Sequence, residues 1–252
     1  MLYIILPAVF LAGALDAIAG GGGLISLPAY LAAGVPPHLA LGTNKFSACF
    51  GTALATARYI KHRMVDLPVA LSCAGCAILG SAAGARAVLL INPSYLHYVL
   101  LVAIPVVAWV TLKKSHAWHI DENHLVLGWR RWAVALGGSL LLGGYDGFFG
   151  PGTGSFLILL FVGVLRYDFV RANGNTKVVN LGTNVAALAI FAMHGQVSLQ
   201  LGVPAALASI AGNWVGSKLV VLRGSRFVRP VFLVSLLLLM IKVIVVTVQS
   251  YQ

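Results

Sequence analysis

The chain alternates long apolar stretches with short polar ones. Four of the stretches contain no Asp, Glu, Lys or Arg: residues 17–44, 67–85, 87–112 and 178–217. A helix needs about 20 apolar residues to cross a bilayer, so each stretch can hold one membrane-spanning helix and the last can hold two. A soluble fold of this size does not contain so many long apolar stretches, and the pattern therefore predicts an all-α polytopic membrane protein.

We expect about eight transmembrane segments, arranged in two sets. Each set opens with two helical arms around a glycine-rich break, Gly20–Gly23 within residues 3–33 and Gly150–Gly154 within residues 132–165. Each pair of arms forms either a re-entrant hairpin or two full spans. The other predicted helices lie near residues 39–58, 67–86, 95–112, 174–193, 200–219 and 229–249.

The two sets are related in sequence. Residues 42–86 align without a gap to residues 174–218 at a constant offset of 132, and eleven of the 45 pairs are identical. Asp16 and its glycine run likewise match Asp146 and the second glycine run. We therefore expect one transmembrane repeat over residues 1–112 and a second over residues 132–252, joined by a cytoplasmic loop at residues 113–131.

The charges of the loops predict how the repeats are related in space. The loop at residues 58–66 carries three Lys or Arg residues, whereas its equivalent at 193–199 carries none. The loop at 34–38 carries none, whereas its equivalent at 166–173 carries two. Cytoplasmic loops are enriched in Lys and Arg, so equivalent loops should lie on opposite sides of the membrane. This is the pattern of an inverted-topology repeat.

Composition agrees with a membrane protein. Apolar residues make up 60% of the chain and charged residues 9%, against about 25% charged in ordinary soluble domains. The net charge of +11 comes from short basic clusters between apolar runs and does not indicate nucleic-acid binding. The three cysteines lie in apolar helical sequence and do not form a disulfide framework.

The glycine breaks are the first candidate for chemistry. Glycine costs about 1 kcal/mol in a helix interior, so these runs should unwind the helix. Unwound backbone at membrane depth is tolerated where protein or water covers it, and its free N–H groups can then bind an ion. Isolated glycines four residues apart, as in Gly80/Gly84 and Gly212/Gly216, favour close helix packing instead.

Lys45 and Lys177 are the second candidate. Each follows a Gly/Thr/Asn triplet, which we interpret as a cap at or near a helix start. A cation there opposes the helix dipole, which favours an anion bound between the two lysines. The alternative is that each ammonium group extends to the membrane interface.

Asp16 and Asp146 are the third candidate, because an acid within an apolar stretch is a functional hypothesis by default. Each could pair with a repeat lysine, cap the helix after it, or carry a proton. Both could also serve a cation or metal permease, which is the alternative function that the residues leave open.

These motifs resemble the TauE/SafE sulfite exporter family, over essentially the whole chain. The resemblance rests on Asp16 with Gly20–Gly23, on Leu41–Lys45, and on Gly150–Ser155 with Gly174–Lys177. It implies a bacterial inner-membrane, multi-pass permease that exports sulfite, sulfonates or related sulfur anions.

The sequence therefore predicts a transporter of a small sulfur-containing anion, driven by the membrane potential, a proton gradient or both. We expect no enzyme activity, catalytic residue, metal site or cofactor, and no nucleic-acid partner; the oligomeric state stays open, a homodimer included. Asp16 and Asp146 are expected to couple or pair ions. The residues expected to bind the substrate are Gly22, Gly23, Thr43, Asn44, Lys45, Gly152, Thr153, Gly154, Ser155, Asn175, Thr176 and Lys177.

Overall fold

The computed structural model describes residues 1–92, 128–224 and 231, and every regular element in this part is a helix. The first repeat contains α1 (Leu2–Ala19), α2 (Gly23–Ala32), α3 (Pro37–Lys61) and α4 (Leu67–Leu89). The second contains α6 (Trp129–Phe148), α7 (Thr153–Gly163), α8 (Phe169–Met193) and α9 (Leu199–Arg223). The all-α prediction is confirmed, and α1, α4, α8 and α9 are long and apolar enough to cross a membrane.

Two predicted helices, near residues 95–112 and 229–249, lie outside the described residues apart from Val231. The predicted loop at 113–131 is wrong at its end, because α6 already begins at Trp129. Its residues 113–127 lie outside the described part.

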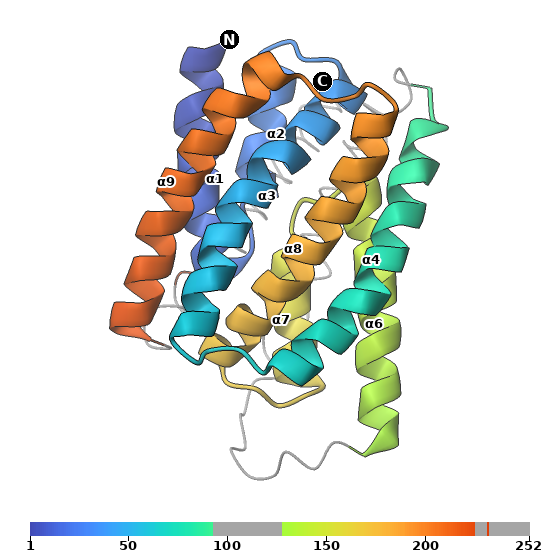
Figure 1. Cartoon of the computed structure of the whole chain (residues 1–252), viewed down its shortest axis with the longest axis vertical. Coiled ribbons are helices and arrows are strands. Elements are labelled where there is room, and N and C mark those ends of the chain that lie inside the picture. The colour runs from blue at the N-terminus through green and yellow to red at the C-terminus, as the bar shows by residue number, and fades with distance from the viewer. Residues whose placement is uncertain (93–127, 225–230, 232–252) are drawn as a thin grey trace, which may run out of the picture.

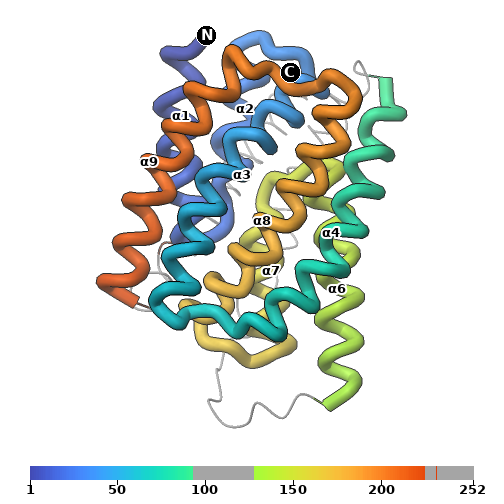
Figure 2. Tube along the Cα trace, viewed as in Figure 1, coloured from blue at the N-terminus to red at the C-terminus, as the bar shows by residue number. Residues whose placement is uncertain are grey.

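Each glycine break joins a long helix to a short one, as Figure 2 shows for the α1–α2 and α6–α7 pairs. At 1.5 Å per residue, the 18 residues of α1 extend about 27 Å and the 10 residues of α2 about 15 Å. The hydrocarbon core of a bilayer is about 30 Å thick. Each pair therefore consists of one helix long enough to span and a half-length helix that returns, which is neither of the two forms expected from the sequence.

Equivalent helices of the two repeats run in opposite directions in Figure 1: α3 descends where α8 ascends, and α4 ascends where α9 descends. The last described helix of each repeat packs in the other half. Helix α9 lies against α1 and α3, and α4 lies against α6 and α8. The two repeats are thus interlocked.

Glycines permit this exchange. A Cβ at Gly80 or Gly84 of α4 would overlap the backbone of α6, and a Cβ at Gly212 or Gly216 of α9 would overlap the backbone of α1. The prediction that these isolated glycines serve helix packing is confirmed.

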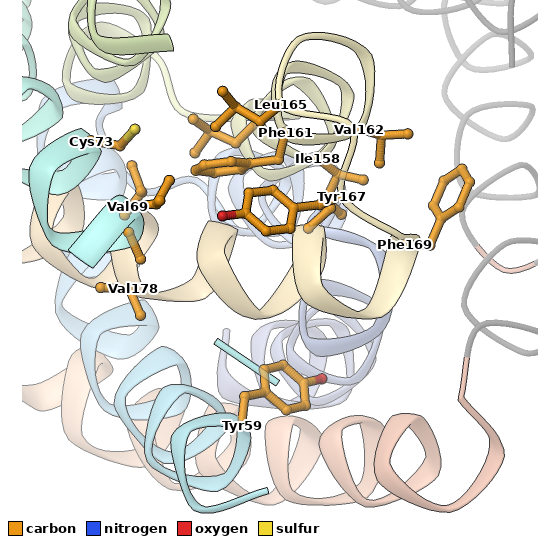
Figure 3. Packing of buried hydrophobic residues seen from close by; sticks show 14 of the residues in the cluster. Tyr59, Val69, Cys73, Ile158, Phe161, Val162, Leu165, Tyr167, Phe169 and Val178 are labelled. Carbon is orange, nitrogen blue, oxygen red and sulfur yellow. The ribbon is translucent and has the colours of Figure 1, made fainter. Parts of the chain in front are cut away.

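Two apolar clusters form the core. The first lies where α3 ends and α8 begins, and Figure 3 shows its tyrosines and phenylalanines, among them Phe161 and Tyr167 with ring centres 6.4 Å apart. The second lies where α3 begins and α8 ends, around Tyr30, Leu41 and Phe191. The middles of α3 and α8, where polar side chains are concentrated, lie between these clusters.

Candidate functional site: a cavity beside two exchanged ion pairs

Among the described residues two lysines are buried, and each binds an aspartate of the other repeat. Lys45 Nζ on α3 lies 2.7 Å from Asp146 Oδ2 on α6, and Lys177 Nζ on α8 lies 2.9 Å from Asp16 Oδ2 on α1. Lys45 also donates to Asn184 Oδ1 at 3.0 Å. Of the roles considered for the aspartates, ion pairing is the one that the structure contains.

The two pairs differ in exposure. The side chain of Lys177 is fully buried while that of Asp16 is 20% exposed; in the other pair, Lys45 and Asp146 are 5% and 6% exposed. A lone buried charge would cost several kcal/mol, so each partner makes the burial of the other tolerable. The four charges sum to zero.

The expected position of the lysines at helix starts is wrong. Helix α3 begins at Pro37 and α8 at Phe169, so both lysines lie more than two turns inside their helices. The true start signals are upstream: Pro37 occupies the first turn of α3, and Asp168 caps α8 by accepting from the backbone N–H groups of Val170 and Arg171. The helix dipole therefore does not oppose these lysines.

The residues just before each lysine pack against a loop of the other repeat. A Cβ at Gly42 would overlap the carbonyl oxygen of Gln196, and one at Gly174 would overlap that of Met64. The next residue in each repeat then accepts a backbone hydrogen bond. Thr43 Oγ1 accepts from Ser198 N at 3.0 Å, and Asn175 Oδ1 accepts from Asp66 N at 2.8 Å. Thr43 and Asn175 thus hold the loops before α9 and α4 rather than a substrate.

Asp66 is further held by Tyr167, whose hydroxyl donates to Asp66 Oδ2 at 2.6 Å. Burial, together with the neighbouring Asp66 carboxylate, raises the pKa of Tyr167 well above its ordinary value. The hydroxyl therefore stays a proton donor under physiological conditions, and the start of α4 stays fixed.

The glycine breaks are non-helical, as predicted, but shorter than predicted. Gly20 (φ +74°) ends α1, and Gly150 (φ +93°) and Gly152 (φ +85°) precede α7. Gly23 and Gly154 are already helical. The breaks touch, since a Cβ at Gly20 would overlap the backbone of Gly154.

The broken end of α1 is capped by other helices. A helix leaves its last four carbonyl groups without partners within the helix, and here they are inside the protein. The carbonyl oxygen of Ala17 accepts from Tyr59 Oη at 2.7 Å and from Asn173 Nδ2 at 2.8 Å. That of Ala19 accepts from Ser155 Oγ at 3.0 Å. Ser155 therefore supports the break.

A cavity of about 60 Å³ lies against both breaks and the ion pairs. The predicted residues that line it are Gly22, Gly23, Asn44, Lys45, Gly154, Asp16 and Asp146. The predicted residues that do not line it are Thr43, Gly152, Thr153, Ser155, Asn175, Thr176 and Lys177. Thr153 instead donates to the carbonyl of Gly150 at 2.8 Å, and Lys177 lies behind Asp16. Of the lysines in the described ranges, Lys45 is the one that lines the cavity.

Sequence reasoning missed the amides of the second repeat. Asn180 and Asn184 on α8, and Ser209 and Asn213 on α9, all line the cavity. Helical spacing could have found the first two, because they follow Lys177 by three and seven residues and so share its face. The repeat comparison obscured them, since the equivalent positions in the first repeat hold Ala48, Thr52, Ala77 and Ser81.

The cavity combines one ammonium group, two carboxylates, and several amides and hydroxyls. Among the described residues, no three His, Cys, Asp or Glu side chains are grouped to hold a metal ion. The arrangement suits a small polar solute held by Lys45 and neighbouring amides between the two repeats.

Comparisons with known proteins give the family. Residues 5–243 match the model of the family described as "Sulfite exporter TauE/SafE". The chain is 33% identical over 244 residues to the "Probable membrane transporter protein ORF9" of a Sinorhizobium species, covering 97% of this chain and 92% of that protein. It is 35% identical over 241 residues to a "Probable membrane transporter protein" of Haemophilus influenzae, covering 93% and 91%. No solved structure matches it.

Proposed function

Since the chain belongs to the sulfite exporter TauE/SafE family of multi-pass membrane transporters, we propose that it exports a small sulfur-containing anion, such as sulfite or an organosulfonate, across a bacterial inner membrane. We also propose that residues 1–112 and 132–252 form two inverted repeats with the substrate site between them. The observation that carries the proposal is the buried ammonium group of Lys45 in the wall of the cavity.

Lys45 offers a binding site that is neutral at rest. Its ammonium group has three protons, of which Asp146 and Asn184 each accept one. An anion in the cavity can accept a hydrogen bond from the third N–H group. It then competes with Asp146 for the electrostatic attraction of the ammonium group. A charge-assisted hydrogen bond contributes about 1.5–3 kcal/mol, enough to hold a small anion without trapping it.

Asp146 allows the bound anion to be released. When the anion leaves, the carboxylate again neutralises Lys45, so the empty site does not retain a free buried charge. Outward movement of a monoanion is favoured by about 2.3 kcal/mol per 100 mV of inside-negative potential. Export therefore needs no nucleotide, and an inward proton gradient can add to the driving force if the anion moves out in exchange for a proton.

The test is sulfite efflux from proteoliposomes under an imposed inside-negative potential. The double variant Lys45→Gln/Asp146→Asn removes the ammonium group without leaving a buried charge, and should weaken the apparent affinity about tenfold to a hundredfold. Lys61→Gln, at an exposed position at the end of the same helix, is the matched control and should behave like the parent. Efflux by the double variant at the parental rate and affinity would place the anion elsewhere.

A cation or metal permease is the second candidate, because both Asp16 and Asp146 line the cavity. The single variant Asp146→Asn separates the two functions. For an anion exporter it frees Lys45, so anion binding should persist or tighten while release slows. For a cation permease it removes a ligand, so cation flux should fall.

A further inference from the structure

An oxygen atom in the wall of the cavity has no hydrogen-bond partner among the residues that the structure describes. Asn213 on α9 is 2% exposed and lines the cavity. Its amide nitrogen Nδ2 donates to the carbonyl oxygen of Ser209 at 3.0 Å. This bond fixes the orientation of the amide, because only the nitrogen can donate to a carbonyl. Among the described residues the remaining atom, Oδ1, has no hydrogen-bond partner.

A second amide oxygen of a cavity-lining residue, Asn180 Oδ1, is also buried and accepts no hydrogen bond from the part of the chain that the structure describes. Leaving a buried acceptor without a donor is destabilising, so such atoms call for an explanation. A deprotonated oxyanion has only acceptors and cannot satisfy them. A ligand with a proton donor can.

These acceptors belong to the second repeat alone. The position equivalent to Asn213 is Ser81, whose hydroxyl donates to the carbonyl of Thr183 at 2.7 Å and does not line the cavity. The position equivalent to Asn180 is Ala48. The acceptors are therefore not required by the repeat architecture.

The charges around the cavity favour the same kind of ligand. The ionisable groups that line it are Asp16 on α1, Lys45 on α3 and Asp146 on α6, with Lys177 on α8 bound behind Asp16. Helices α2, α7 and α9 contribute no ionisable side chain to the lining. Because the four charges sum to zero, a dianion would bring two uncompensated charges into a buried site, and a monoanion only one.

We propose that the site takes its oxyanion in the singly protonated form, with an anionic oxygen on Lys45 and the acidic hydroxyl group donating to Asn213 Oδ1. The transported species is then a hydrogen oxyanion, hydrogensulfite rather than sulfite. This inference rests on the function proposed above.

Binding to the purified protein in detergent, followed by calorimetry, tests the proposal with two probes. The first is sulfite, titrated at pH values on both sides of the point where hydrogensulfite loses its proton. The second is methanesulfonate, a monoanion that has no hydroxyl proton at any of these pH values. Apparent affinity for total sulfite should fall about tenfold per pH unit above that point. Methanesulfonate should bind more weakly than hydrogensulfite and with constant affinity over the same pH values, so that a pH dependence seen with sulfite alone comes from the ligand.

Asn213→Ala removes the acceptor. It should weaken hydrogensulfite binding about tenfold, the typical loss for one hydrogen bond, and leave methanesulfonate binding unchanged. Ser81→Ala, at the equivalent position of the other repeat, is the matched control and should change neither. The unchanged methanesulfonate affinity also demonstrates that Asn213→Ala is folded.

A sulfite affinity that is constant or rises with pH, or an Asn213→Ala variant that loses both probes equally, overturns the inference while the proposed function stands. If the parent protein binds neither probe, the proposed function itself fails.

Discussion

Each buried lysine in the described part of the chain depends on an aspartate from the other repeat. Lys45 pairs with Asp146, and Lys177 pairs with Asp16. No charged side chain in the two pairs is neutralised within its own half. The charges therefore favour association of the two repeats as well as a binding site. The pair at Lys177, whose fully buried lysine does not line the cavity, serves the first purpose.

This division predicts how Lys177 acts on stability. Lys177→Met leaves the partly buried Asp16 carboxylate without its partner, and should lower the free energy of unfolding by about 3–5 kcal/mol. The double variant Lys177→Met/Asp16→Asn removes both charges and should recover most of the loss. Unfolding by denaturant titration in micelles measures both values.

Lys61→Met is the control, because Lys61 is exposed and its replacement should change stability by less than about 0.5 kcal/mol. A Lys177→Met protein as stable as the parent would mean that the pair contributes nothing to folding.

The sequence was sufficient to single out all four of these charges, because ionisable residues are rare in apolar stretches. It was not sufficient to place the lysines along their helices. The Gly/Thr/Asn triplets have the composition of helix caps. In the structure, however, each glycine leaves room for a loop of the other repeat, and Thr43 and Asn175 each accept a hydrogen bond from a backbone N–H group of that loop. Such contacts join residues more than 100 positions apart and leave no local signal.

At the scale of elements, the glycine breaks decide where the cavity can form. Gly20 ends α1 in the left-handed region of backbone conformation and lies directly on Gly154 at the start of α7. The sequence predicted the breaks because runs of glycine weaken a helix. It did not predict the half-length of α2 and α7, since both lie in apolar sequence and hydrophobicity alone does not end a helix within such a stretch.

Gly20→Ala tests the contact between the breaks. A non-glycine residue in the left-handed region costs about 1–2 kcal/mol, and overpacking adds about 1–3 kcal/mol. We therefore expect a loss of about 2–5 kcal/mol in unfolding free energy, together with loss of transport. Denaturant titration and proteoliposome flux measure the two effects.

Gly75→Ala provides the control on α4, where a Cβ would meet no atom within 4 Å. This variant should be as stable as the parent or gain up to about 1 kcal/mol from helix propensity. Equal stability of the two alanine variants would rule out a tight junction at Gly20.

At the scale of the whole molecule, basic side chains gather at one end. Among the described residues this end, where α3 and α9 finish and α6 and α8 start in Figure 1, carries Arg58, Lys61, Arg63, Arg130, Arg131, Arg166, Arg171, Lys218 and Arg223. The opposite end, where α4 finishes, carries Arg86. The positive-inside rule assigns the basic end to the cytoplasm.

Two of these arginines have unfavourable backbone conformations. Arg63 and Arg166 have φ values of +56° and +60°, and the equivalent positions in the other repeat are Gly195 (+67°) and Gly34 (+81°). The backbone turn is thus common to both repeats, but glycine fills it at one end and arginine at the other. Arginine costs about 1–2 kcal/mol more than glycine there, which a requirement for positive charge at the cytoplasmic end explains.

Accessibility from the two sides of the membrane tests this orientation. His62 and His194 occupy equivalent positions just after α3 and α8, which run in opposite directions. In a background without Cys49, Cys73 and Cys76, a cysteine replacing His194 should react with a membrane-impermeant maleimide in intact cells. A cysteine replacing His62 should react only after the membrane is permeabilised, because its loop is cytoplasmic.

Arg86→Cys, at the end of α4 that lies beside the end of α8, should label like the His194 position and serves as an internal reference. Labelling of the His62 and His194 positions from the same side would exclude the inverted arrangement, and with it a substrate site placed between two oppositely oriented repeats.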